Sequence, residues 1–208
     1  MTKTILILLT GLLFLSCKDE KNNTVSLDEN IKSELWEDKT ETYLPITGEW
    51  TNRVEVADIN GDKMIDLLFA NGGNYSSPGE PEYSRIFINQ GADKKFKEIT
   101  NHVFSDSKFL SRVIKVRDIN KDSIPDLIIG TTYQTQSQLY LGLGNGEFKN
   151  VTSTQLPQVN ASVGDLELGD VDDDGDLDIV LSDWGAGSVM DNICLLYTSP
   201  SPRDRTRS

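Results

Sequence analysis

Three short stretches of the chain carry acidic and amide side chains at the same spacing, at positions 1, 3, 5 and 9 of a loop. Alternate side chains of a tightly curled backbone turn to the same side, so positions 1, 3 and 5 can converge on one point. Hard cations such as Ca²⁺ take six to eight oxygens at about 2.3–2.6 Å. With the position 7 carbonyl added, the predicted ligands are Asp58, Asn60, Asp62, Met64 and Asp66, then Asp118, Asn120, Asp122, Ile124 and Asp126, then Asp170, Asp172, Asp174, Asp176 and Asp178.

Charge repulsion points to the same cation. Two carboxylates about 4 Å apart repel by roughly 4 kcal/mol at an effective dielectric near 20. For a single copy the alternative is a solvated acidic turn, since Asp, Asn and Gly are common turn residues. Position 6, where a positive φ is often needed, is Gly175 in the third loop but Lys63 and Ser123 in the others. We therefore expect calcium occupancy to fall in the order third, first, second.

The segments around these loops predict strands. Helix-loop-helix calcium sites close with Glu at position 12, but here that position holds Phe69, Ile129 and Leu181 within apolar runs. Further strands are predicted at residues 86–89, 96–100, 139–142 and 148–152, with Asn145-Gly146 as a type I′ hairpin turn. The loops repeat after 60 residues (58 to 118) and 52 residues (118 to 170), which suits four-stranded propeller blades.

This pattern resembles the FG-GAP/VCBS repeats of β-propellers, the architecture of integrin alpha-subunit heads and many bacterial surface proteins. The resemblance covers about residues 50–193 and implies an all-β propeller with Ca²⁺ in the blade hairpin loops. The predicted repeats span residues 45–193, as units of about 45–105, 106–157 and 158–193. Two full blades and part of a third cannot close a ring, so we expect a truncated fragment with an exposed strand edge.

The N-terminus predicts a processing signal. Residues 1–16 have a basic Lys3 and an apolar stretch that is too short to span a bilayer but suits secretion. Phe14-Leu15-Ser16-Cys17 resembles a bacterial lipobox, which implies acylation of Cys17. The following Lys18-Asp19-Glu20 resembles the surface-export signal of Bacteroidetes-type lipoproteins, and residues 17–44 would form the polar tether. The prediction is a lipid-anchored protein of the outer membrane, on the cell surface. The alternatives are an uncleaved short anchor, or a buried cysteine after an ordinary signal.

The C-terminal segment, residues 194–208, departs from the acidic chain before it. It resembles the translation, in one frame, of a transposon-based sequencing adapter, which would make it non-native. The alternative is a basic disordered tail.

The net charge and the residue types present limit the classes of function that the protein can have. A net charge of −13 argues against nucleic acid as a partner, because phosphate binding needs clustered Lys and Arg. The only histidine, His102, is expected at the surface, and no nucleophile or zinc motif is evident. We expect a non-catalytic, calcium-stabilised surface module that binds a glycan or protein. Its candidate contacts are Tyr75, Tyr83, Tyr133 and Trp184, although aromatic residues near turns can equally pack between blades. The rival prediction is the propeller part of a carbohydrate-active enzyme or its accessory, with a catalytic region outside this sequence.

Overall fold

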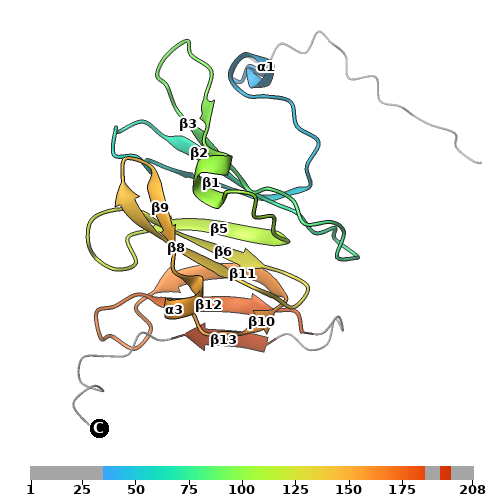
Figure 1. Cartoon of the computed structure of the whole chain (residues 1–208), viewed down its shortest axis with the longest axis vertical. Coiled ribbons are helices and arrows are strands. Elements are labelled where there is room, and N and C mark those ends of the chain that lie inside the picture. Colours follow the sequence, from blue (N-terminus) through green and yellow to red (C-terminus); the bar gives the residue numbers. More distant parts are fainter. Residues whose placement is uncertain (1–34, 186–192, 198–208) are drawn as a thin grey trace, which may run out of the picture. The chain divides into compact units, whose positions relative to one another are not determined.

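Three antiparallel sheets follow one another along the chain, one for each acidic loop (Figure 1). The computed structural model describes residues 35–185 and 193–197. The sheet orders are β1-β2-β3-β4, β5-β6-β8-β9 and β11-β12-β13. This confirms the all-β, propeller-like fold of two four-stranded units and part of a third. The strands are β1 (Thr51–Ala57), β2 (Asp66–Asn71), β3 (Arg85–Ile88), β4 (Lys97–Glu98), β5 (Ser111–Arg117), β6 (Asp126–Thr131), β7 (Thr135–Gln136), β8 (Gln138–Gly144), β9 (Glu147–Asn150), β10 (Asn160–Ala161), β11 (Val163–Gly169), β12 (Asp178–Asp183) and β13 (Ile193–Tyr197).

The strand register repeats from sheet to sheet. Each acidic loop connects an equivalent pair, Ala57 with Asp66, Arg117 with Asp126 and Gly169 with Asp178. At the other end of each pair of strands the register shifts by one residue, at Asn52, Arg112 and Gly164. These shifts are β-bulges, in which one extra residue interrupts the strand pairing and its side chain points in a different direction. The three bulge residues therefore hold equivalent places in the three units.

Two short helices end the first and second units. Helix α2 (Thr100–Phe104) follows β4, and α3 (Thr152–Gln155) follows β9, whereas α1 (Thr40–Tyr43) precedes β1. The strands predicted at 96–100 and 148–152 end earlier than expected, at Glu98 in β4 and at Asn150 in β9. The cause is local: the Thr100 and Thr152 hydroxyls accept the N–H groups of Ile86 and Leu139 at 3.1 and 2.9 Å, where a ladder carbonyl would otherwise do so.

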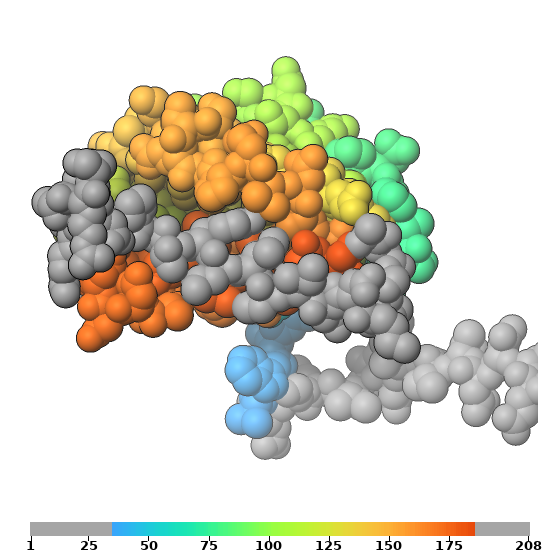
Figure 2. All heavy atoms as spheres, turned by 90° about the horizontal axis from the view of Figure 1, so that it is seen from below, coloured from blue at the N-terminus to red at the C-terminus, as the bar shows by residue number. Residues whose placement is uncertain are grey.

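The apolar core lies between the sheets. Strand β6 is buried along its whole length. Its Leu127 and Ile129 belong to the cluster shared with the first sheet, and its Ile128 to the cluster shared with the third. Burying side chains of this size stabilises a fold by roughly 1.5–3 kcal/mol each. The second sheet is thus covered on both faces. In the space-filling view, green, yellow and orange parts of the chain adjoin one another (Figure 2).

Backbone pairs between units hold neighbouring sheets together at one place in the repeat. Glu82 pairs with Phe109 across the first junction. At the second junction β10 pairs with β7. The sheets are therefore joined by hydrogen bonds as well as by apolar contact.

Strand β13 occupies the third place in the third sheet, where it pairs with β12. Four of its residues, 194–197, fall in the segment predicted to be non-native. Pairing needs only an open strand edge and a β-compatible backbone, so the origin of residues 194–208 stays a prediction. The predicted signal at residues 1–16 and Cys17 lie outside the described residues. In the described segments, no helix has the length and apolar character that crossing a membrane requires.

Candidate functional site

All three acidic loops have the same backbone form. Positions 4 and 6 both adopt the left-handed conformation, which non-glycine residues enter at a cost of roughly 1–2 kcal/mol. The positive φ predicted at position 6 is confirmed, and the one at position 4 was not foreseen. The φ values at positions 4 and 6 are 82° and 70° (Gly61, Lys63), 62° and 70° (Lys121, Ser123), and 59° and 91° (Asp173, Gly175).

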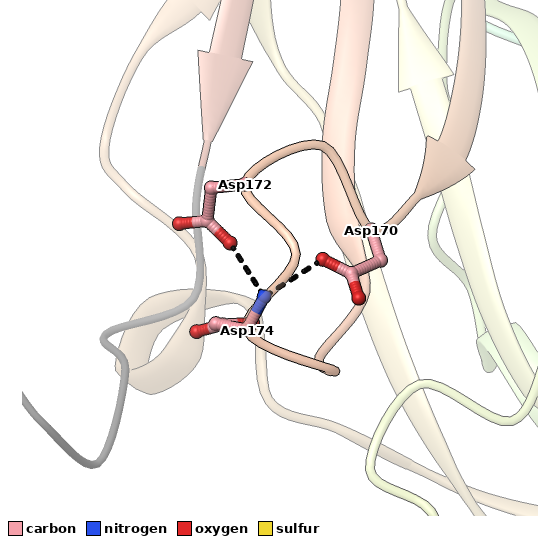
Figure 3. Close-up of side chains that lie close together, drawn as sticks. All are labelled: Asp170, Asp172 and Asp174. Atoms are coloured by element: carbon pink, nitrogen blue, oxygen red, sulfur yellow. Dashed lines mark hydrogen bonds between the residues drawn. The ribbon is translucent and has the colours of Figure 1, made fainter.

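Hydrogen bonds to the loop backbone fold the side chains at positions 1, 3 and 5 over the loop. In the third loop, Asp170 Oδ1 accepts the N–H of Asp174 at 3.1 Å, and its Oδ2 accepts the N–H of Gly175 at 2.9 Å. Asp172 also accepts the N–H of Asp174, at 3.3 Å (Figure 3). The same bonds recur in the other two loops. The predicted convergence of alternate side chains thus follows from the backbone itself.

The third loop brings three carboxylates together. Oxygens of Asp170, Asp172 and Asp174 all lie within 4.8 Å of one another (Figure 3). Within the described residues, Asp174 Oδ2 is buried and has no hydrogen-bond partner. Partial removal from water, and then the negative charges of Asp174 and Asp178, raise the pKa of Asp172. An all-oxygen donor set with uncompensated negative charge fits a hard divalent cation such as Ca²⁺.

The first two loops relieve this repulsion with an amide. Asn60 Nδ2 donates to Asp62 Oδ2 at 2.9 Å, and Asn120 Nδ2 donates to Asp122 Oδ2 at 2.9 Å. In the third loop the equivalent residue is Asp172, whose carboxylate has no amide N–H to offer. The corresponding oxygen of Asp174, Oδ2, has no donor among the described residues. The third loop is therefore the one whose charge most needs a cation.

The aspartates at position 9 face inward instead. Asp66, Asp126 and Asp178 are fully buried. Asp66 Oδ2 accepts the N–H of Ile59 at 3.0 Å, and its Oδ1 accepts the N–H of Asn89 at 2.9 Å. Burial raises the pKa of Asp66, and the two N–H groups oppose that rise. Asp66 thereby ties its loop to the residue after β3, and Asp178 is not among the three converging carboxylates. Its part in metal binding stays a prediction.

A lysine from the second loop reaches the third. Lys121 Nζ donates to Asp176 Oδ1 at 2.7 Å and to the carbonyl of Gly175. The hydrogen bond to Asp176, and the charges of Asp176, Asp174 and Asp170, raise the pKa of Lys121. A cation beside the candidate metal site thus comes from another unit, which the spacing within one loop could not predict.

Three of the four predicted contact residues come together at the opposite end of the sheets. The rings of Tyr75 and Trp184 meet edge to face with centroids 6.2 Å apart. The Tyr133 hydroxyl donates to the carbonyl of Asn74 at 2.9 Å, beside Tyr75 in the chain. Arg112, which sequence reasoning missed, lies among them, with its guanidinium carbon 5.6 Å from the Trp184 ring centroid. In the sequence, Arg112 is marked only by its place in the repeat, which is equivalent to that of Asn52 and Gly164.

The fourth predicted contact, Tyr83, lies apart from that group. Its ring lies 4.8 Å from Lys108 Nζ and lines a polar cleft of about 810 Å³. The same cleft contains His102, whose Nε2 is 2.7 Å from Glu147 Oε2. Both of these side chains are more than half exposed, so His102 lies at the surface as predicted.

The repeated loop-and-strand units define a protein of the propeller-repeat class. The FG-GAP-like repeat model matches residues 58–129 and 118–181, so the chain belongs to the FG-GAP-like repeat family. The chain is 26% identical to human integrin alpha-6 over 150 residues, which cover 71% of this chain and 13% of the integrin. It is 27% identical to rat phosphatidylinositol-glycan-specific phospholipase D over 178 residues, which cover 72% of this chain and 20% of that protein. The repeats indicate an integrin-like interaction module.

Proposed function

We propose that the chain is a non-catalytic binding module whose repeats are stabilised by Ca²⁺. The observation that carries this proposal is the third loop, where three carboxylates converge and the buried Asp174 Oδ2 has no donor in the described part of the chain. Bound Ca²⁺ would supply the positive charge that the loop lacks. Asp170, Asp172 and Asp174 would hold it, and the ion would serve the fold rather than a reaction.

The acidic loops lack the properties of an acid–base centre. A general base must be available to accept a proton, whereas the carboxylates of the third loop would be occupied by the bound ion. Scaffolds of this kind leave binding to their connecting loops. The exposed aromatic residues at the other end of the sheets support that role, with a glycan or a protein as ligand and no nucleic acid.

The proposed location is the outer membrane of a bacterium, at the cell surface, through a lipid on Cys17. The lipobox-like Phe14-Leu15-Ser16-Cys17 and the following Lys18-Asp19-Glu20 support it. In a bacterial host, labelled palmitate should attach to the wild type and not to Cys17→Ala. Equal labelling of both proteins would remove this part of the proposal.

The second candidate is the propeller part of an enzyme or of an enzyme accessory. The similarity to phosphatidylinositol-glycan-specific phospholipase D favours it. The match covers 20% of that protein, so the chain corresponds to a minor part of it. The complete reading frame separates the candidates: a further globular domain favours the enzyme, and a chain that only continues the repeat favours the binder.

Thermal unfolding with calcium or a chelator tests the calcium proposal. A ligand at about 100 times its Kd stabilises by roughly 2.7 kcal/mol, or about 5–10 °C for a chain of this size. Calcium should raise the melting temperature of the wild type. In Asp174→Ala this rise should be smaller, because most of the third loop's contribution to it is lost. Asp106→Asn, which removes an exposed acid outside the loops, should respond like the wild type. A wild type that ignores both calcium and chelator would contradict the proposal.

A further inference from the structure

The bulge residues of the three units meet at the end of the sheets away from the acidic loops. Asn52 donates from Nδ2 to the carbonyl of Ser111 at 2.8 Å, which joins the first bulge to the second. Arg112 in turn donates from Nη1 to Asn52 Oδ1 at 2.6 Å. The third bulge residue, Gly164, lies against the indole of Trp184. Repetition of the bulge thus builds one continuous surface from three units.

Arg112 is a buried cation that has no anionic partner among the residues the structure describes. Its exposed fraction is 8%. Its hydrogen-bond acceptors are neutral, namely Asn52 Oδ1 and the carbonyl of Asn74 at 3.2 Å from Nη2. Its Nε is buried with no acceptor, and no carboxylate of the described residues lies within 4.0 Å of its guanidinium. Buried charges are costly unless paired, so the site favours an anion.

Trp184 covers the guanidinium from one side, and the chain makes room for it. A Cβ on Gly164 would stand 2.1 Å from Trp184 Nε1, so only glycine allows the indole to lie there. The guanidinium carbon is 5.6 Å from the ring centroid, a cation–π distance. Trp184 and Tyr75 still expose 40% and 72% of their surfaces. Flat apolar surface therefore adjoins the buried charge.

The loop beside this group is strained. Tyr133 and Gln134 both adopt left-handed conformations, with φ of 54° and 58°. The hydroxyl of Tyr133 is fixed to the Asn74 carbonyl, and the N–H of Gln134 donates to Ser162 Oγ at 3.1 Å. Consecutive residues of this kind cost of order 1–3 kcal/mol each, and such strain clusters at ligand sites.

We infer that this surface binds an acidic saccharide. A sugar carboxylate would pair with those N–H groups on Nη1 and Nη2 of Arg112 that have no acceptor among the described residues, and the sugar ring would lie against Trp184 and Tyr75. The inference rests on the proposed ligand-binding function and names the ligand class for it. The net charge of −13 disfavours a densely charged polyanion, whereas a saccharide with sparse carboxylates combines an anion with the apolar ring faces that the aromatic side chains match.

Calorimetric titration of the protein at constant calcium tests this site. The probes are a glucose oligosaccharide that carries one glucuronic acid residue (the glucuronate probe), an all-glucose oligosaccharide of the same length (the neutral probe) and a peptide with a single glutamate, of the same charge as the glucuronate probe. The glucuronate probe should bind the wild type at least about tenfold more tightly than the neutral one, because a charged hydrogen bond contributes roughly 1.5–3 kcal/mol. Arg112→Met should remove that preference, and Tyr75→Ala should weaken binding of both saccharides severalfold. Lys108→Ala, which removes a cation elsewhere on the surface, should change neither.

Several outcomes would overturn the inference. They are no binding of the glucuronate probe, equal binding of the neutral probe, and binding of the peptide alone. If Arg112→Met does not fold, Tyr75→Ala decides, because its side chain lies at the surface; unchanged affinity in that variant would refute the site. The calcium response is scored separately on the same samples. If calcium stabilises the protein but the glucuronate probe does not bind, the calcium proposal holds and the saccharide site is refuted. If the probe binds but calcium has no effect, only the calcium proposal is refuted.

Discussion

The position 9 aspartate of the second loop offers a sharp test of what holds each loop to its sheet. Asp126 is fully buried. Its Oδ1 accepts the N–H of Gly142 at 2.8 Å, and its Oδ2 accepts those of Ile119 and Asn120 at 2.8 and 3.3 Å. In Asp126→Asn one oxygen becomes an NH₂ group, which faces a backbone N–H and cannot accept from it. The substitution keeps the shape and removes acceptors, so it isolates the hydrogen bonds.

The size of the effect follows from these contacts. Hydrogen bonds to charged groups contribute roughly 1.5–3 kcal/mol each, and a donor left buried without a partner costs a similar amount. The amide can turn so that its Nδ2 replaces Oδ1, which loses only the bond from Gly142 and leaves that buried donor without an acceptor. Together these two costs predict a loss of about 3 kcal/mol in the free energy of unfolding. The melting temperature should then fall by about 6–12 °C. Urea unfolding in chelator measures the loss without any contribution from bound metal.

The control is Asp118→Asn in the same loop. Asp118 also accepts two backbone N–H groups, from Asp122 and Ser123 at 3.0 and 2.9 Å, but these bonds are exposed. Water can replace them, so the loss should stay below about 1 kcal/mol. If Asp126→Asn cost no more than Asp118→Asn in chelator, the inward carboxylate would not be what fixes the loop.

Three further predictions concern other contacts. Gly175→Ala should destabilise the protein by about 1 kcal/mol in urea unfolding because of its φ of 91°, whereas Gly169→Ala, with open space around its Cβ, should not; equal effects would contradict the strain argument. Burial raises the pKa of Glu49, but hydrogen bonds from Thr47 and Arg85 outweigh it and lower the pKa overall. The stability advantage of wild type over Glu49→Gln should thus be full above about pH 4.5, its ordinary value, and decline as the pH falls below it; an advantage that grows in acid would refute the sign. Lys121→Met should tighten calcium binding severalfold in low-salt titrations, because it removes a cation beside the third loop. This gain in affinity should shrink in high salt, and the control Lys149→Met should not show it.

The sequence determined those features that depend on neighbouring residues. The Asn145-Gly146 turn has the positive φ values, 54° and 79°, that its type requires. The acidic loops adopt one form because their spacing lets side chains at positions 1, 3 and 5 accept N–H groups a few residues away. The apolar runs after them became β2, β6 and β12, because alternate residues of each face a core.

Tertiary packing decided which residues of different units contact one another. The inward turn of Asp126 depends on Gly142, and the reach of Lys121 to Asp176 crosses from one unit to the next. The gathering of Tyr75 and Trp184 around Arg112 joins residues of three units. No local spacing encodes such contacts. They arise because equivalent bulges and loop ends fall side by side once apolar faces have stacked the sheets, and side chains from distant parts of the chain then share one surface.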